Sequence, residues 1–334
     1  MNNNELTFCA TVTVVLFLAL TSIAQAQMSR TFVSADGKDS NPCDSPEKPC
    51  RNIQAGITKV LAGGEVVVIS SGSYQPFTVN KSVTVVGSPG AHVAISAAVG
   101  VDGVKVQAAP ADVIVLRGLT IKGAGANVSD LSEGIEFAHN QGKSLHVENC
   151  VISGFENGLF FNADGNLYIK DTSIKNNWSA EILVGTSPGK PIGVIERTRF
   201  ESSTTGIHLI DDARLTIRDS VFLGPGQGIV TNDAGPTSGT AEINIENTIF
   251  TGNVFGGIVT QNNAVVSVSN CTIAHGNVGI FSNSPGSVIR VSSTTITRNV
   301  EGLKAVTGSI LSRGNNTLEG NTTDGAFTGS FAAK

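Results

Sequence analysis

The sequence predicts an all-β solenoid built from short stacked strands, on the basis of three observations. These are a glycine-rich and charge-poor composition, a strand template that recurs along the chain, and a small residue at a constant distance after most copies of the template. The chain has 334 residues, of which 38 are glycine, 40% are apolar and 15% are charged. Average proteins contain about 7% glycine and about 25% charged residues. The composition therefore suits a protein with many turns.

The same composition excludes several other classes of protein. Coiled coils and long helices are dominated by Ala, Glu, Lys, Leu and Arg, whereas this chain has few charged residues. Apolar residues are plentiful and the net charge is only −5, which excludes a disordered chain. No patch of Lys and Arg occurs along the sequence, so we expect no nucleic-acid partner.

Residues 1–26 are predicted to form a secretory signal peptide. Residues 12–23 are apolar, and a small-x-small cleavage site follows at Ala24-Gln25-Ala26. The segment before them carries Glu5 and no Lys or Arg, which is atypical, so an uncleaved anchor is the alternative. We expect the mature protein to be secreted or periplasmic and to have no membrane span.

The four cysteines after this segment are predicted to play two different roles. Cys43 and Cys50 flank the loop CDSPEKPC, which in an exported protein favours a local disulfide. A zinc site is the competing interpretation, but no further ligands lie nearby in the sequence. Cys150 and Cys271 occupy one repeat position about five coils apart, so we expect buried free thiols that cannot bond to each other.

The template alternates apolar and variable residues, continues with Asn or Asp and a small residue, and ends on Ile or Phe. Its clearest copies are 145–152, 167–174, 215–222, 243–250 and 266–273. The final residues, which we call anchors, are Ile121, Ile152, Ile174, Phe200, Phe222, Phe250, Ile273, Ile296 and Leu318. The spacing between successive anchors is 22 to 31 residues, a length typical of a solenoid coil.

A small residue follows most anchors after six positions. These residues are Gly158, Ala180, Gly206, Gly228, Gly256, Gly279 and Gly302. A unit of about 22 residues cannot bury its apolar face alone, and stacked units share one core. The distance from the anchor to the small residue is constant, whereas the turns later in each unit vary in length. This predicts a coil with one strict corner and one variable corner.

This pattern is similar to that of the right-handed parallel β-helix repeat family, the architecture of pectate-lyase-like proteins. The resemblance covers about residues 31–327. It implies a right-handed parallel β-helix over 66–327, preceded by an N-terminal segment over 27–65. In the family a short helix caps the first coil, and Ile53, Ile57, Val60 and Leu61 fall on one helical face within 51–61. We expect the C-terminal tail, 328–334, to be extended.

Charged residues four positions before the anchors alternate in sign, in the order Arg117, Glu148, Lys170, Glu196, Arg218 and Glu246. Equivalent positions in stacked coils lie about 4.8 Å apart, so this row predicts a ladder of cross-strand ion pairs. An acid/base pair is the alternative, and the regularity of the row favours the structural role. The next position, which holds mostly Asn and Asp, is predicted to form a turn.

The candidates for catalysis form one weak cluster on the outward column of the strands that follow the small residue. Glu136, Glu181 and His208 fall in this column, and Asp211 and Asp212 follow at the next turn. A glycosidase needs two carboxylates at a defined separation, which neighbouring coils could supply. A solvated face with an incidental histidine is the favoured interpretation. Polygalacturonase-like sites of this family combine an Asp pair, a Gly-His-Gly turn and an Arg-x-Lys motif. Asp211-Asp212 and Ala274-His275-Gly276 resemble the first two, but they are separated by about three coils and no Arg-x-Lys follows. We therefore interpret this match as chance.

Trp178 is the candidate ligand-binding residue, because an indole ring can stack on a sugar. Because every recognisable catalytic motif is absent or broken, the sequence favours a non-catalytic exported protein that binds a polysaccharide or another surface polymer along the solenoid face. The alternative is a polysaccharide lyase or glycoside hydrolase acting on an acidic polysaccharide. No cofactor or metal is expected, except Ca²⁺ under the lyase alternative.

Overall fold

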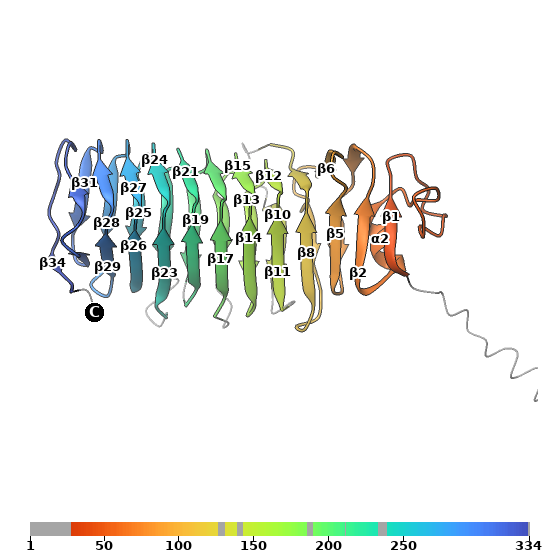
Figure 1. Cartoon of the computed structure of the whole chain (residues 1–334), viewed down its shortest axis with the longest axis horizontal. Coiled ribbons are helices and arrows are strands. Elements are labelled where there is room, and N and C mark those ends of the chain that lie inside the picture. The colour runs from red at the N-terminus through yellow and green to blue at the C-terminus, as the bar shows by residue number, and fades with distance from the viewer. Residues whose placement is uncertain are drawn as a thin grey trace, which may run out of the picture.

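The computed structural model of the protein describes residues 28–125, 131–138, 143–185, 190–210, 212–232 and 239–332. The predicted signal peptide and Asp211 lie outside these described residues. The described chain winds into one elongated solenoid, with successive coils stacked side by side along its long axis (Figure 1). No helix in this part of the chain is long and apolar enough to cross a membrane.

Three parallel sheets, which we call A, B and C, run along the solenoid. Sheet A has 13 strands: β1 (Met28–Val33), β2 (Val60–Val68), β5 (Val83–Gly87), β8 (Val113–Arg117), β11 (Ser144–Glu148), β14 (Asn166–Lys170), β17 (Ile192–Glu196), β20 (Arg214–Arg218), β23 (Ala241–Glu246), β26 (Ala264–Ser269), β29 (Val288–Ser292), β32 (Ser309–Ser312) and β34 (Gly329–Ser330).

Sheets B and C complete each coil. Sheet B has 11 short strands: β3 (Gly72–Tyr74), β6 (Val93–Ser96), β9 (Leu119–Lys122), β12 (Val151–Ser153), β15 (Ser173–Lys175), β18 (Arg199–Glu201), β21 (Val221–Leu223), β24 (Ile249–Thr251), β27 (Thr272–Ala274), β30 (Thr295–Thr297) and β33 (Thr317–Leu318). Sheet C has ten: β4 (Phe77–Val79), β7 (Val104–Val106), β10 (Glu133–Ala138), β13 (Asn157–Asn162), β16 (Ala180–Val184), β19 (Thr205–Ile210), β22 (Gln227–Asn232), β25 (Gly256–Thr260), β28 (Val278–Ser282) and β31 (Glu301–Ala305).

The chain visits the sheets in the order A, B, C in every coil from β2 to β31, and all strand pairs are parallel. This confirms the predicted parallel β-helix. From β11 to β31 the turns from A to B and from B to C keep their length to within one residue, whereas the connection from C to A varies in length. For example, β13 ends at Asn162 and β14 starts at Asn166, but β22 ends at Asn232 and β23 starts only at Ala241.

Each strict corner bends through a residue in the left-handed backbone region. The first corner lies three positions before the anchor and has φ between 45° and 68° at Gly118, Asn149, Asp171, Arg197, Asp219, Asn247, Asn270 and Ser293. The second lies two positions after the anchor and includes Asn176, Ser202, His275 and Arg298. Asn and Asp enter this region more readily than most residues do. His275 is therefore a corner residue of the repeat.

The core is a set of side-chain columns that run through the coils. Phe200, Phe222 and Phe250 stack with ring centroids 4.5 and 4.6 Å apart. Cys150 and Cys271 are buried free thiols, as predicted. In other coils the same position holds Thr or Ser. There the hydroxyl of one coil accepts a hydrogen bond from a backbone N–H of the previous coil, as the Thr172 hydroxyl does from the Cys150 N–H at 3.3 Å. Burial raises the pKa of both thiols to about 11, so they stay unreactive.

The N-terminal end is closed by helix α2 (Ile53–Lys59), which buries Ile53, Gly56 and Ile57 beside β1 and β2 (Figure 1). The predicted helix was too long. Val60 and Leu61 belong to β2, and Leu61 is 41% exposed rather than on the helix's apolar face. The predicted disulfide between Cys43 and Cys50 is present. Lys59 of α2 donates a hydrogen bond to the carbonyl of Asp39, just before the disulfide loop, at 2.7 Å. This bond holds the segment against the helix.

The predicted charge ladder is confirmed in part. Arg117 contacts Glu148 at 2.8 Å, and Glu196 contacts both Lys170 at 3.4 Å and Arg218 at 2.5 Å. Arg197 of the adjacent corner adds a third cation to Glu196, at 3.0 Å. At the C-terminal end β34 pairs with β32, so the described part of the tail is extended, as expected.

Candidate functional site

The corner between sheets B and C carries a row of glycines. Strand register aligns Gly103, Gly134, Gly158, Glu181, Gly206, Gly228, Gly257, Gly279 and Gly302. Two predicted members of the row were wrong. Glu181 and Gly257 take the places expected for Ala180 and Gly256, because each follows its anchor by seven residues and not by six.

Next to this row, the B-to-C turns of four coils form a depression that we call the turn groove. It has a volume of about 470 Å³ and is lined by Asn176, Asn177, Trp178, Ser202, Ser203, Thr204, Gly224, Gly226, Val254 and Phe255. None of these side chains carries a charge. The groove therefore combines amide and hydroxyl groups with two aromatic rings on a neutral surface.

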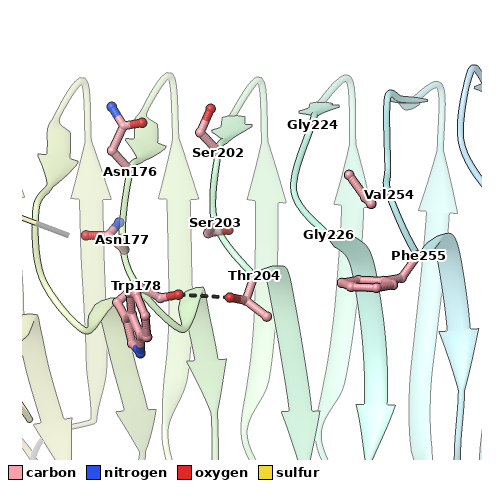
Figure 2. A pocket seen from close by; sticks show the side chains of 10 residues that line it. All are labelled: Asn176, Asn177, Trp178, Ser202, Ser203, Thr204, Gly224, Gly226, Val254 and Phe255. Carbon is pink, nitrogen blue, oxygen red and sulfur yellow. Dashed lines mark hydrogen bonds between the residues drawn. The ribbon is translucent and has the colours of Figure 1, made fainter. Parts of the chain in front are cut away.

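Trp178 and Phe255 stand at the two ends of the turn groove, with Thr204 and Gly226 between them (Figure 2). The exposed fractions of the two aromatic residues are 47% and 60%. A side chain on Gly226 would lie 3.0 Å from the Phe255 ring, so the absence of one there gives the ring room beside the backbone. The two rings are three coils apart, or about 14 Å at the usual strand spacing.

The turn that presents Trp178 is fixed by hydrogen bonds to the neighbouring coils. The Trp178 N–H donates to the Phe155 carbonyl at 2.8 Å, and the Trp178 carbonyl accepts from the Thr204 hydroxyl at 3.0 Å. Asn177, which is buried, accepts from the Phe155 N–H at 3.0 Å and donates to the Glu181 carboxylate. The backbone on both sides of the indole is therefore held in place.

The structure does not bring the predicted catalytic cluster together. In the outward column of sheet C, Glu136, Phe160, Leu183 and His208 lie in four successive coils. Leu183 occupies the position that was expected for Glu181 or Ile182. Glu181 is instead fully buried at the glycine-row corner. His208 lies between Leu183 and Val230, and burial lowers the pKa of its imidazole.

Asp212 lies apart from these residues, after the end of β19. Its carboxylate contacts Lys190 at 3.2 Å and accepts a hydrogen bond from the Thr240 N–H at 2.7 Å. Hydrogen bonding to Lys190 is the main reason that the pKa of Asp212 lies below its usual range. These contacts give Asp212 a structural partner on each neighbouring coil.

Glu136 belongs to a different group, the carboxylate cluster, which comprises Asp102, Lys105, Glu133 and Glu136. Lys105 contacts Glu136 at 2.5 Å and Asp102 at 3.6 Å. Glu133 accepts a hydrogen bond from the Asn157 amide at 3.1 Å. A pocket of about 220 Å³ adjoins the cluster and includes Phe77, Val101 and Gln54 in its lining.

The protonation states within the carboxylate cluster differ. Burial raises the pKa of Glu133 to about 8 and also raises the pKa of Asp102. Hydrogen bonding to Glu136 raises the pKa of Lys105. At neutral pH Glu133 is therefore a protonated acid, and Lys105 is a cation rather than a base.

Sequence reasoning missed Asp102, Lys105 and Glu133 because they fall outside the clearest copies of the template. Register is the missing information: Lys105 and Glu136 are direct partners on β7 and β10, although 31 residues separate them. Phe255 was missed because it occupies a turn position with no pattern of its own. Among the described residues, no three His, Cys, Asp or Glu side chains are placed to hold a metal ion.

Exposed aromatic side chains also occur on the outer face of sheet A. Tyr168 of β14 is 38% exposed and stacks on His146 of β11, with ring centroids 4.5 Å apart. This pair lies on a different face from the turn groove and beside the charge ladder. Tyr168 therefore offers a matched control for variants of Trp178.

Comparisons with known proteins agree with the architecture. Residues 89–240 match the family model described as the right handed beta helix region. No curated protein sequence matches the chain. Among solved structures, pectate lyase Pel9A is similar with a TM-score of 0.64 and 17% identity, over 88% of this chain and 79% of that one.

Two further solved structures show the same fold. The A-module of mannuronan C-5 epimerase AlgE6 from Azotobacter vinelandii has a TM-score of 0.58 and 15% identity, over 84% of this chain and 93% of that one. The Dettilon tailspike protein has a TM-score of 0.53 and 14% identity, over 83% of this chain and 63% of that one. At these identities the likeness concerns the fold alone. The described chain thus has a parallel β-helix fold, and its residues 89–240 match the right handed beta helix region.

Proposed function

We propose that this protein binds a polysaccharide along the side of the solenoid, in the turn groove. The observation that carries the proposal is the pair of exposed rings, Trp178 and Phe255, at the ends of a neutral, hydroxyl-lined depression. Sugars present apolar C–H faces and polar hydroxyl edges, which suit aromatic rings beside hydrogen-bonding groups.

The shape of the turn groove favours a linear polymer. It crosses four coils in the direction of the solenoid axis, so a chain could lie along it and contact both rings at once. Because the lining carries no charge, we propose that the bound segment is neutral. A pectate lyase and a mannuronan epimerase share this fold, which supports a role on polysaccharides without separating binding from catalysis.

The test uses Trp178, the only tryptophan in the chain, as an intrinsic probe. We expect neutral polysaccharides of the class that binds to change the tryptophan fluorescence in a saturable manner. Trp178→Ala should weaken binding, measured by calorimetry or affinity electrophoresis, by about tenfold or more, since a stacked ring contributes about 1–3 kcal/mol by analogy with aromatic stacking on bases.

The matched control is Tyr168→Ala, which removes an aromatic ring of similar exposure from sheet A. We expect it to leave binding within about twofold of the wild-type value. Equal losses in both variants, or full binding by Trp178→Ala, would show that the turn groove is not the binding site.

A second candidate function, hydrolysis of a glycosidic bond, is favoured by the carboxylate cluster. Glu133 is protonated at neutral pH and could serve as a general acid, while Glu136 beside the Lys105 cation could serve as the second carboxylate. The raised pKa of Lys105 disfavours a lyase reaction, which needs a base. Release of reducing ends by the wild type but not by Glu133→Gln would support this candidate, and release by neither would remove it.

A further inference from the structure

We propose that Glu181 is a positioning residue for the turn groove: its buried carboxyl group holds Asn177 and thereby the turn that presents Trp178. Ionisation of the carboxyl group would release this turn. The consequence for ligand binding rests on the function proposed above for the groove, whereas the positioning of Trp178 does not.

Glu181 occupies a position in the glycine row, between Gly158 and Gly206. At the neighbouring glycines an added Cβ would lie very close to the carbonyl oxygen of the next coil, 2.3 Å at Gly134 and 2.5 Å at Gly206. Real Cβ atoms do not approach that closely, so these corners exclude a side chain. Glu181 is the one member of the aligned row that carries a side chain, and that side chain is ionisable.

The side chain of Glu181 contacts Asn177. Glu181 is fully buried, and its Oε2 accepts a hydrogen bond from the Asn177 amide. Asn177 is itself only 2% exposed, and its Oδ1 accepts from the Phe155 N–H. Asn177 directly precedes Trp178, so the Glu181 carboxyl lies one hydrogen bond behind the indole-bearing turn.

The charged groups around Glu181 affect whether its carboxyl group ionises. No ionisable residue lies on β13, and the ionisable side chains on the other elements around Glu181 are Glu156, Lys175, Arg199, Glu201 and His208. Arg199 and Glu201 pair with each other, and His208 is neutral above its lowered pKa. Burial, opposed by hydrogen bonding from Asn177, raises the pKa of Glu181 to about 8.

The sign of the pH effect follows from that raised pKa. Below pH 8 the folded protein keeps Glu181 neutral, and the hydrogen bond to Asn177 needs no compensating cation. Above pH 8 the carboxyl loses its proton, and a buried charge without a cation is strongly unfavourable. Movement of the Asn177–Trp178 turn would admit water to the carboxylate and so lower the free energy of the buried charge.

The experiment measures acrylamide quenching of Trp178 fluorescence in the full chain, without ligand, between pH 6 and 9. The window ends below the range in which tyrosines ionise, near pH 10. We expect wild-type quenching to rise with a midpoint near pH 8, and we expect Glu181→Gln to show no transition, because Gln keeps the acceptor and cannot ionise. A flat wild-type profile, or the same transition in Glu181→Gln, overturns the proposal.

Binding provides the second readout. If only the neutral form is competent, the wild-type apparent Kd rises by about tenfold between pH 7 and 9, as the competent fraction falls, while that of Glu181→Gln stays within about twofold. Failure of the proposed function has a different signature: no polysaccharide perturbs Trp178 at any pH, yet the ligand-free transition is still present.

Glu181→Gly is the second variant, and it remains informative if the glutamine variant does not fold. Glycine is the residue found at this corner in the other coils of the row, so the fold should accept it, but the Asn177 acceptor is lost. We expect strong quenching of Trp178 that does not depend on pH. Weak, wild-type-like quenching at neutral pH in this variant would contradict the positioning role.

Discussion

Single residues at the strict corners hold the left-handed backbone conformation that bends each coil. The sequence predicts this for the Asn and Asp residues that precede the small position of the template, such as Asn270, where φ is 53°. It does not predict Arg197 or Ser293, which adopt the same conformation with φ of 45° and 46°. There the stacking of neighbouring coils imposes the conformation on residues that disfavour it.

This account predicts opposite outcomes for two substitutions at one corner. Asn270→Val should lower the free energy of unfolding by about 1–2 kcal/mol, since a β-branched residue is strained at positive φ. Asn270→Gly should be close to neutral. Chemical denaturation of the two variants measures the difference, and equal stabilities would show that the corner conformation carries no strain.

The local sequence does not show that Glu181, and not Ala180, occupies the corner of its coil. Ala180 and Glu181 are adjacent, and the small residue is the natural choice for a tight corner. Only the pairing of β16 with β13 and β19 reveals that the turn has one extra residue and that the glutamate takes the corner. A one-residue change in register reverses the direction in which every side chain of a strand points.

At the scale of strands, the charge ladder joins the carboxyl-terminal ends of neighbouring strands in the middle of sheet A. The alternating signs were visible in the sequence because strand spacing repeats, and five of the six residues, all but Glu246, make at least one of the expected pairs. The third cation on Glu196 was not predicted, because Arg197 is a corner residue whose side chain turns back along the sheet. Arg197 also contacts Asp171 at 2.7 Å.

We therefore expect Glu196→Gln to destabilise the protein by about 1–2 kcal/mol at neutral pH, since ion pairs of this kind contribute about 0.2–1 kcal/mol each. Hydrogen bonding from Arg218 lowers the pKa of Glu196 below its usual range. The stabilisation is thus present above the unfolded-state pKa and is lost as the pH falls through the folded-state pKa.

Thermal unfolding of the wild type and of Glu196→Gln, measured at pH 7 and near pH 3, tests this prediction. Glu242→Gln is the control, because its partner Arg214 lies 3.4 Å away and both side chains are half exposed. The two Tm values should converge in acid for the Glu196 variant. A difference that persists near pH 3 would mean that the effect comes from packing and not from charge.

At the scale of the whole molecule, the parallel β-helix was predictable, whereas Trp178 was the only residue of the turn groove that the sequence singled out. Periodic anchors specify that the coils stack, and the helix α2 beside the Cys43–Cys50 loop closes one end of the stack. Sites depend instead on which residues of different coils become neighbours across a turn. The turn groove joins Trp178 to Phe255, which are 77 positions apart in the sequence, and no motif connects them.

The central claim is that a neutral polysaccharide lies in the turn groove between these two rings. A crystal structure of the full chain with an oligosaccharide of the best-binding polymer tests it most directly. We predict sugar rings stacked on Trp178 and Phe255, with hydroxyl groups hydrogen-bonded to the Ser202–Thr204 turn. An oligosaccharide bound instead at the carboxylate cluster around Glu133, with the turn groove empty, would contradict the account.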